Sequence, residues 1–99
     1  MTMKAIMITY NQAFYDDIVE VLNQNGVKGY TEWDEIKGHG SVSGEPHLGS
    51  HAWPTLNNAI FTIMEDTQVD GVLNDLHAKD EKAPELGLRA FVWNIEKMI

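Results

Sequence analysis

The order of apolar patterns along the chain constrains its fold more than any other feature. Four segments are rich in residues that favour strands, and they cover residues 4–10, 30–37, 58–65 and 88–95. Two further segments, residues 13–25 and 67–79, carry apolar side chains at helical spacing. The order strand, helix, strand, strand, helix, strand (β-α-β-β-α-β) is that of a ferredoxin-like α+β sandwich. We therefore expect one domain over residues 1–99, in which two helices cover one face of an antiparallel four-stranded sheet.

The ends of both expected helices carry capping signals. Asn11 is suited to cap the first helix, and Asn25 with Gly26 forms a left-handed stop after it. Asp66 or Thr67 is suited to open the second helix. These signals place each helix between two strands, as the sandwich requires.

The strand patterns predict different places in the sheet. Residues 4–10, 58–65 and 88–95 are almost continuously apolar, which is typical of central strands. Residues 30–37 do not alternate cleanly around Trp33, which indicates an edge strand or a bulge.

Apolar side chains on the sheet face without helices would be exposed to water in a single chain. We expect apolar side chains of the central strands on that face, and the candidates are Ile8, Phe61, Phe91 and Trp93. A symmetric oligomer would bury them.

Charge and composition exclude several classes of function. Seven Lys and Arg stand against fifteen Asp and Glu, which gives a net charge of −8 and predicts no binding to nucleic acid. No apolar run approaches the roughly 20 residues that a membrane-spanning helix needs, and the apolar start does not resemble a signal peptide. The chain has no cysteine, so thiolate catalysis and thiolate metal sites are excluded. We expect a cytoplasmic protein that does not insert into membranes.

A long loop separates the two halves of the chain. Residues 37–57 are expected to lack secondary structure, and loops of this length in small domains are usually functional. Three of the four histidines lie in this loop, so it is the first candidate for a binding site.

The loop carries a set of candidate ligands for zinc, copper or nickel. These are His39, His47 and His51, with Glu45 as an additional carboxylate. The spacing of His47 and His51 would place them on one helical face, but Leu48 stands where a zinc-protease helix carries its glutamate. Solvated loop histidines are the alternative interpretation. If metal binds, its affinity is expected to fall below about pH 6.5, where histidine becomes protonated.

At this point the chain resembles the PII-like signalling proteins. The resemblance lies in residues 25–31, 36–44, 65–72 and 89–93, and it includes the glycine pattern at Gly38, Gly40 and Gly44. It implies that residues 38–56 form the T-loop, through which these proteins contact partners. It also implies a homotrimer with ligand clefts between subunits, bordered by the T-loop and by a second loop, the B-loop, at residues 79–87. Asp80 and Glu81 would then lie in a solvated turn.

The resemblance implies a set of ligand-binding residues. They are Gly38, Gly40, Ser41, Gly44, Gly87 and Arg89. Arg89 occupies the position of the family's phosphate-binding lysine, which favours an anionic ligand. Ser41 and Val42 replace a basic residue and a glutamine, and valine has no group that binds charge or metal. We therefore expect weak or no binding of Mg-ATP and no effect of 2-oxoglutarate.

Three functions fit these observations. The first is a PII-like regulatory protein that senses an anion or a divalent metal and acts on a transporter or an enzyme through its T-loop. The second is a metal-binding or metal-tolerance protein similar to the trimeric CutA family. The third is an enzyme, such as a ferredoxin-like dimeric monooxygenase. No paired nucleophile and base stands out, so we identify no catalytic residue and do not expect an enzyme.

Overall fold

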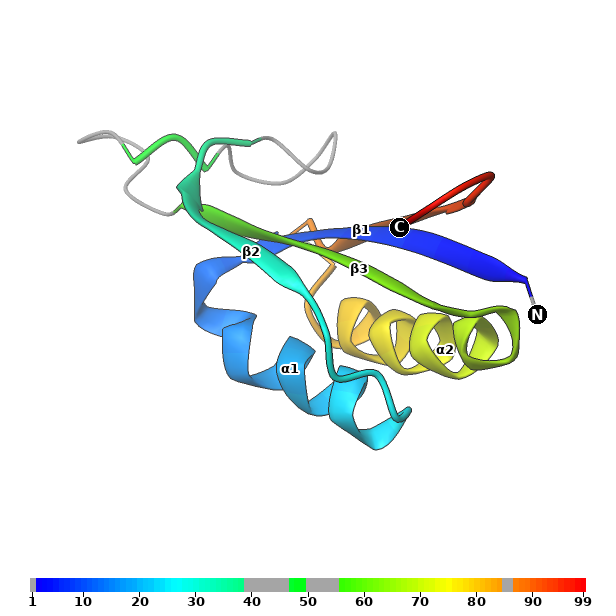
Figure 1. Ribbon diagram of the computed structural model, residues 1–99. Coiled ribbons are helices and arrows are strands. Elements are labelled where there is room, and N and C mark those ends of the chain that lie inside the picture. Colours follow the sequence, from blue (N-terminus) through cyan, green and yellow to red (C-terminus); the bar gives the residue numbers. More distant parts are fainter. Residues whose placement is uncertain (1, 39–46, 50–55, 85–86) are drawn as a thin grey trace.

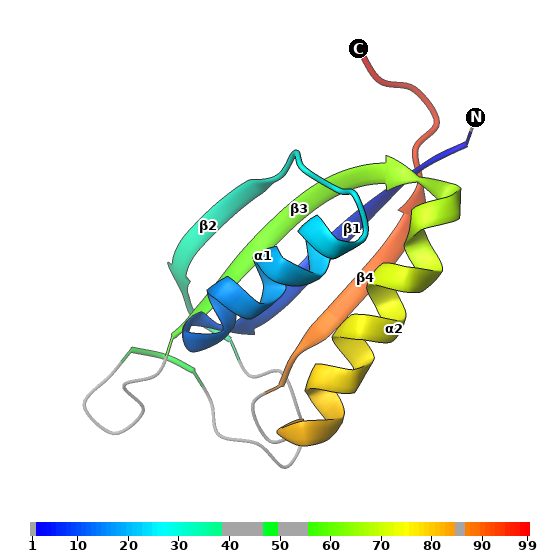
Figure 2. The same cartoon turned by 90° about the horizontal axis from the view of Figure 1, so that it is seen from below.

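A computed structural model describes residues 2–38, 47–49, 56–84 and 87–99 of the chain. Its elements are β1 (Met3–Asn11), the 3-10 helix η1 (Gln12–Phe14), α1 (Tyr15–Gln24), β2 (Thr31–Ile36), β3 (Asn57–Glu65), α2 (Asp66–Lys82) and β4 (Arg89–Asn94). This order confirms the predicted β-α-β-β-α-β sandwich. Both helices lie on the same face of the sheet (Figures 1 and 2).

The sheet has the strand order β2-β3-β1-β4, and each neighbouring pair is antiparallel. The central place predicted for residues 4–10 and 58–65 is confirmed, since they belong to β1 and β3. The same prediction for residues 88–95 is wrong, because β4 lies at the edge. Its apolar pattern does not reflect burial within this chain: the side chains of Phe91 and Trp93 are 55% and 45% exposed.

The core lies between the sheet and the two helices. Ile6, Ile8 and Tyr10 of β1 are fully buried there, and each such apolar side chain stabilises the fold by about 1.5–3 kcal/mol. The helices contribute Ile18, Val21 and Leu22 from α1 and Val69, Val72 and Leu76 from α2. Ile8 therefore faces the helices, and the expectation that it lies on the uncovered face is wrong.

Both ends of the first helical region follow the capping signals. The Asn11 side chain accepts a hydrogen bond from the Ala13 backbone N–H at 2.9 Å, and α1 ends before Gly26, whose φ is +76°. A positive φ favours glycine, because glycine has no Cβ to clash with the backbone.

The second helix begins and ends differently from the prediction. Its N-cap is Glu65 rather than Asp66 or Thr67, and the Glu65 N–H donates to Gln68 Oε1 at 3.0 Å. The helix continues to Lys82, so Asp80 and Glu81 lie in its last turn and not in a solvated loop. Lys79 and Lys82 near this end suit the negative end of the helix dipole.

Strand β2 carries the predicted irregularity at the predicted place. It is an edge strand, and its pairing with β3 shifts register between Trp33 and Ile36. Glu35 within this bulge has a φ of 56°, and its N–H donates to the Asn58 side chain at 3.1 Å. The Asn58 contact offsets part of the cost of this uncommon backbone conformation.

In the described part of the chain, neither helix has the length and apolar character that crossing a membrane requires.

Candidate functional site

Two described positions of the long loop, Gly38 at its start and His47 near its middle, pair with each other. The Gly38 N–H donates to His47 O at 2.7 Å, and the His47 N–H donates to Gly38 O at 2.5 Å. A Cβ on Gly38 would lie 2.6 Å from Asn57 Nδ2, so a larger residue would force the Asn57 side chain to move. A side chain at position 38 would therefore disturb Asn57, which also contacts His47.

The imidazole of His47 is buried at this junction. The residue is 3% exposed, and its Nδ1 makes a hydrogen bond with Asn57 Oδ1 at the start of β3. Of the four predicted metal ligands, His47 alone lies among the described residues, while His39, Glu45 and His51 lie outside them. Residues 2–38, 47–49, 56–84 and 87–99 hold no group of three or more metal-ligating side chains placed to share an ion. The predicted metal site therefore stays a prediction.

The turn before β4 and the start of this strand hold two of the residues predicted to bind ligand, Gly87 and Arg89. Gly87 has a φ of +74°, and its N–H donates to Pro84 O at 3.3 Å. Leu88 is 4% exposed and anchors the turn in the core. Arg89 follows as the first residue of β4, opposite Thr9 of β1. Gly40, Ser41 and Gly44, which were also predicted to bind ligand, lie outside the described residues.

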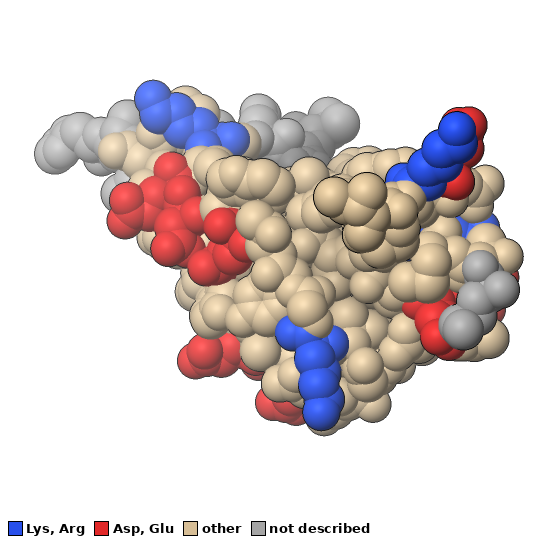
Figure 3. Space-filling model, in the orientation of Figure 1, with Lys and Arg blue, Asp and Glu red and all other residues tan. Residues whose placement is uncertain are grey.

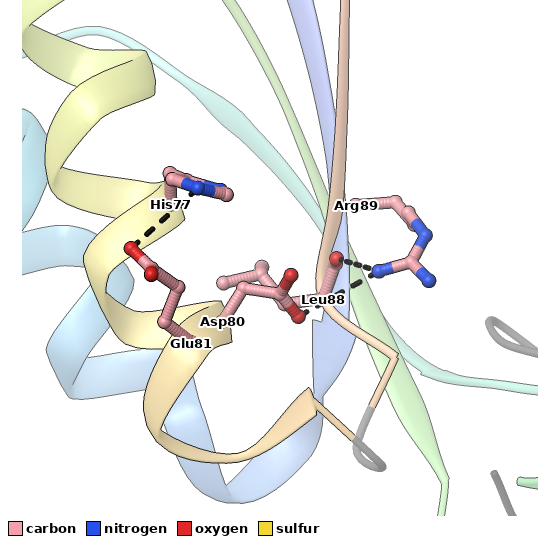
Figure 4. A network of polar contacts seen from close by, with 5 residues as sticks. All are labelled: His77, Asp80, Glu81, Leu88 and Arg89. Carbon is pink, nitrogen blue, oxygen red and sulfur yellow. Dashed lines mark hydrogen bonds and ion pairs between the residues drawn. The ribbon is translucent and has the colours of Figure 1, made fainter.

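The guanidinium of Arg89 has two described partners. Its Nη1 donates to Leu88 O at 2.6 Å and forms an ion pair with Asp80 Oδ1 at 3.6 Å (Figure 4). A second, more exposed pair joins His77 Nε2 and Glu81 Oε1 at 3.5 Å on the same helix. The end of α2 and the start of β4 therefore hold two carboxylates, Asp80 and Glu81, beside the guanidinium of Arg89.

A hollow of about 400 Å³ lies beside this network, between α2 and β4. Leu73, Leu76 and Leu88 give it an apolar side, and its polar lining includes His77, Asp80 and Arg89. The hollow is large enough for a small molecule, and Arg89 supplies a cation that can bind oxyanions.

The other face of the sheet carries no helix in the described part of the chain (Figure 1). The strand register places Phe61, Phe91 and Trp93 on this face, in line with the prediction for these three residues. The rings of Phe61 and Trp93 lie 5.9 Å apart, centroid to centroid. Trp33 of β2 is on the same face and is 47% exposed.

Comparison with known proteins identifies the family. The family model described as nitrogen regulatory protein P-II matches residues 3–99. This chain belongs to the P-II family. A search of curated protein sequences found no match.

Solved P-II-like structures share the fold. The CPII protein of Thiomonas intermedia K12 bound to ADP, AMP and bicarbonate matches with a TM-score of 0.79 and 22% identity, over 96% of this chain and 87% of that chain. CPII bound to ADP and bicarbonate matches with a TM-score of 0.77 and 21% identity, over the same shares. A putative PII-like signalling protein of Thermus thermophilus matches with a TM-score of 0.67 and 24% identity, over 96% of this chain and 88% of that chain.

This P-II family protein also has a polar cluster that sequence reasoning missed. The Tyr10 hydroxyl donates to Glu32 Oε2 at 3.2 Å, and Asn58 Nδ2 donates to the same oxygen at 3.3 Å. Burial raises the pKa of the Glu32 carboxyl above its ordinary value, and the negative charge of Asp34 raises it further. The broken alternation of β2 was the sequence signal, because it put Glu32 on the helix side of the sheet.

A pair of tyrosines lies next to this cluster. The Tyr15 and Tyr30 hydroxyls are 2.7 Å apart, and this hydrogen bond is the main reason that the pKa of Tyr15 rises to about 12. An open, acidic hollow is lined by Tyr15, Glu32 and Asp34, among others. In Figure 3 acidic side chains gather over the region of β2. In this P-II family protein the acidic surface near β2 therefore disfavours anions.

Proposed function

We propose that this P-II family protein is a single-domain, homotrimeric regulator in the cytoplasm. It binds a small anion, of the class of adenosine diphosphate or bicarbonate, in clefts between subunits. It reports the bound state to a partner, a membrane transporter or an enzyme, through the T-loop at residues 38–56. The observation that carries the proposal is Arg89, a partly exposed guanidinium that follows a glycine turn at the edge of the sheet.

Electrostatics make Arg89 the decisive group. A net charge of −8 repels anions over most of the surface, so anion binding needs a cation held in one place. A guanidinium offers a planar set of donors that matches two oxygens of a phosphate or a bicarbonate. ADP and bicarbonate are both oxyanions, and both are bound in solved CPII structures.

The uncovered sheet face supports the trimer. Phe91 and Trp93 are large apolar side chains on an exposed edge strand, and subunit contacts would remove them from water. Arg89 lies on the same strand, so a cleft between subunits at this edge would bring a second chain close to its guanidinium. The anion then has a site that the isolated chain does not complete.

The loop residues favour ADP or bicarbonate over Mg-ATP as the ligand. Ser41 and Val42 lack the charge and the amide that the family resemblance associates with metal and 2-oxoglutarate. The chain therefore has Arg89 to bind an anion, but it lacks the side chains that the family resemblance associates with metal binding.

Titration calorimetry with ADP and with bicarbonate tests the anion site. We expect Arg89→Gln to weaken binding by about tenfold or more, because it removes a charge-assisted hydrogen-bond donor. Lys28→Gln is the matched control, since it removes the same charge from a surface position outside the site. Equal affinity of wild type and Arg89→Gln would refute the anion site. Native mass spectrometry of the same samples gives the subunit count and any retained ligand.

A further inference from the structure

In the described part of the chain, Asp80 holds the one buried side-chain polar atom that makes no hydrogen bond. This atom, Oδ1, is shielded from solvent, and its ionic partner is Arg89 at 3.6 Å, beyond ordinary hydrogen-bond length. Buried carboxylate oxygens nearly always receive hydrogen bonds, because desolvating a charge is costly. Asp80 therefore depends on the guanidinium for compensation.

The position of Asp80 on α2 adds to this dependence. It lies in the last turn of the helix, where the dipole is negative and a carboxylate is unfavourable. Arg89 offsets both the charge of Asp80 and the helix end.

The Arg89 side chain takes an indirect path to reach Asp80. Its register opposite Thr9 places Arg89 on the same side of the sheet as Phe91, whereas α2 covers the other side. In Figure 4 the side chain leaves β4 on the side away from α2 and turns back, so that Nη1 points toward Asp80 and Leu88 O. The guanidinium is thus held at the strand edge by Asp80 and the Leu88 carbonyl.

We propose that Asp80 sets the anion affinity of this protein by competing with the ligand for Arg89. This inference rests on the proposed function. A bound oxyanion and the Asp80 carboxylate are both negative and both need the same guanidinium, so each weakens the binding of the other. Asp80 keeps the affinity low enough that the site responds to changes in ligand concentration.

The opposite role makes an opposite prediction. If Asp80 only positioned Arg89 for the ligand, then removing its charge would loosen the guanidinium and weaken binding. The sign of the change in affinity therefore separates competition from positioning.

The experiment is calorimetric titration of the purified oligomer with ADP and with bicarbonate. We expect Asp80→Asn to bind at least one of the two about tenfold more tightly, because a like charge close to the ligand is gone. Asp80→Glu should stay close to wild type. Glu81→Gln is the matched control, because it removes the same charge from the next residue, whose described partner is His77.

Two further measurements make the result decisive. Thermal unfolding shows that each variant is folded, and the double variant Asp80→Asn with Arg89→Gln should lose the gain in affinity. Unchanged or weaker binding by Asp80→Asn, while Arg89→Gln loses binding, would overturn the role of Asp80 and leave the anion site intact. If Arg89→Gln binds as wild type does, or if no variant binds either probe, the anion site itself fails and the role of Asp80 fails with it.

Discussion

Glu32 is a residue whose protonation the fold controls. It accepts hydrogen bonds from Tyr10 and Asn58, yet burial first and the charge of Asp34 second raise its pKa above the ordinary value of 4.5. Folding therefore favours the protonated form of Glu32. The resulting stabilisation is complete below about pH 4.5 and is lost as the pH rises through the higher pKa of the folded state.

This sign predicts the effect of Glu32→Gln. At pH 7 the variant should be more stable than wild type, by less than about 1 kcal/mol because the site is partly open to solvent. The difference should vanish near pH 4, where wild-type Glu32 is protonated in the folded state. Urea unfolding at the two pH values measures it, with Glu20→Gln as a control on the exposed face of α1. A variant less stable than wild type at pH 7 would show that the hydrogen bonds outweigh the burial.

The residues around Arg89 differ in how far the sequence alone could predict them. The family resemblance predicts Gly87 and Arg89 as ligand-binding residues, because a glycine turn before a cation is a local pattern. Asp80 could not be predicted, since its sequence neighbourhood is that of a solvated charge run. Its partner is nine residues away on another element, and only the packing of α2 against β4 brings the two together.

At the scale of elements, the contact between the end of α1 and the side of α2 is unusually close. Asn25 Nδ2 donates to Val21 O at 2.8 Å and to Asp75 Oδ2 at 2.9 Å, and Gln68 Nε2 donates to Asn25 O at 3.1 Å. A Cβ on Gly71 would lie 2.3 Å from Asn25 Oδ1. Glycine in the middle of α2 thus permits this approach.

Gly71→Ala tests the contact against helix propensity. Propensity alone predicts a gain of about 1 kcal/mol in an exposed helix. We expect a net loss of about 1 kcal/mol instead, because the Asn25 side chain must move and give up two hydrogen bonds worth about 1 kcal/mol each. Gly29→Ala is the control, since no atom lies within 4 Å of its added Cβ. Chemical denaturation measures both variants, and a more stable Gly71→Ala protein would contradict the expectation.

For the molecule as a whole, the sheet face without helices is the feature that bears on assembly. Phe61, Phe91 and Trp93 lie on it, and the last two are about half exposed in the single chain. Exposed aromatic residues grouped on one sheet face are typical of subunit interfaces.

We expect Trp93→Glu to dissociate the proposed trimer, because an unpaired carboxylate buried at the proposed interface would be costly. Sedimentation velocity or light scattering should show a shift to monomer at micromolar concentration. Tyr30→Glu is the control, because Tyr30 is an exposed aromatic residue outside the strands. If Trp93→Glu keeps the subunit number of wild type, the interface lies elsewhere.

The sequence by itself determined the features that depend on neighbours along the chain. Helical spacing, the Asn11 cap, the Gly26 stop and the β2 bulge near Trp33 all follow from patterns a few residues long. The order of these elements was enough to predict the sandwich.

Only the tertiary structure decided which strands lie at the edge, on which face of the sheet Ile8 lies, and which carboxylate pairs with Arg89. An apolar strand such as β4 has the same local pattern whether helices, water or another subunit cover it. The pairing of Asp80 with Arg89 depends on how α2 packs beside β4. Contacts of this kind arise from burial and strand register between distant segments, so short sequence patterns do not predict them.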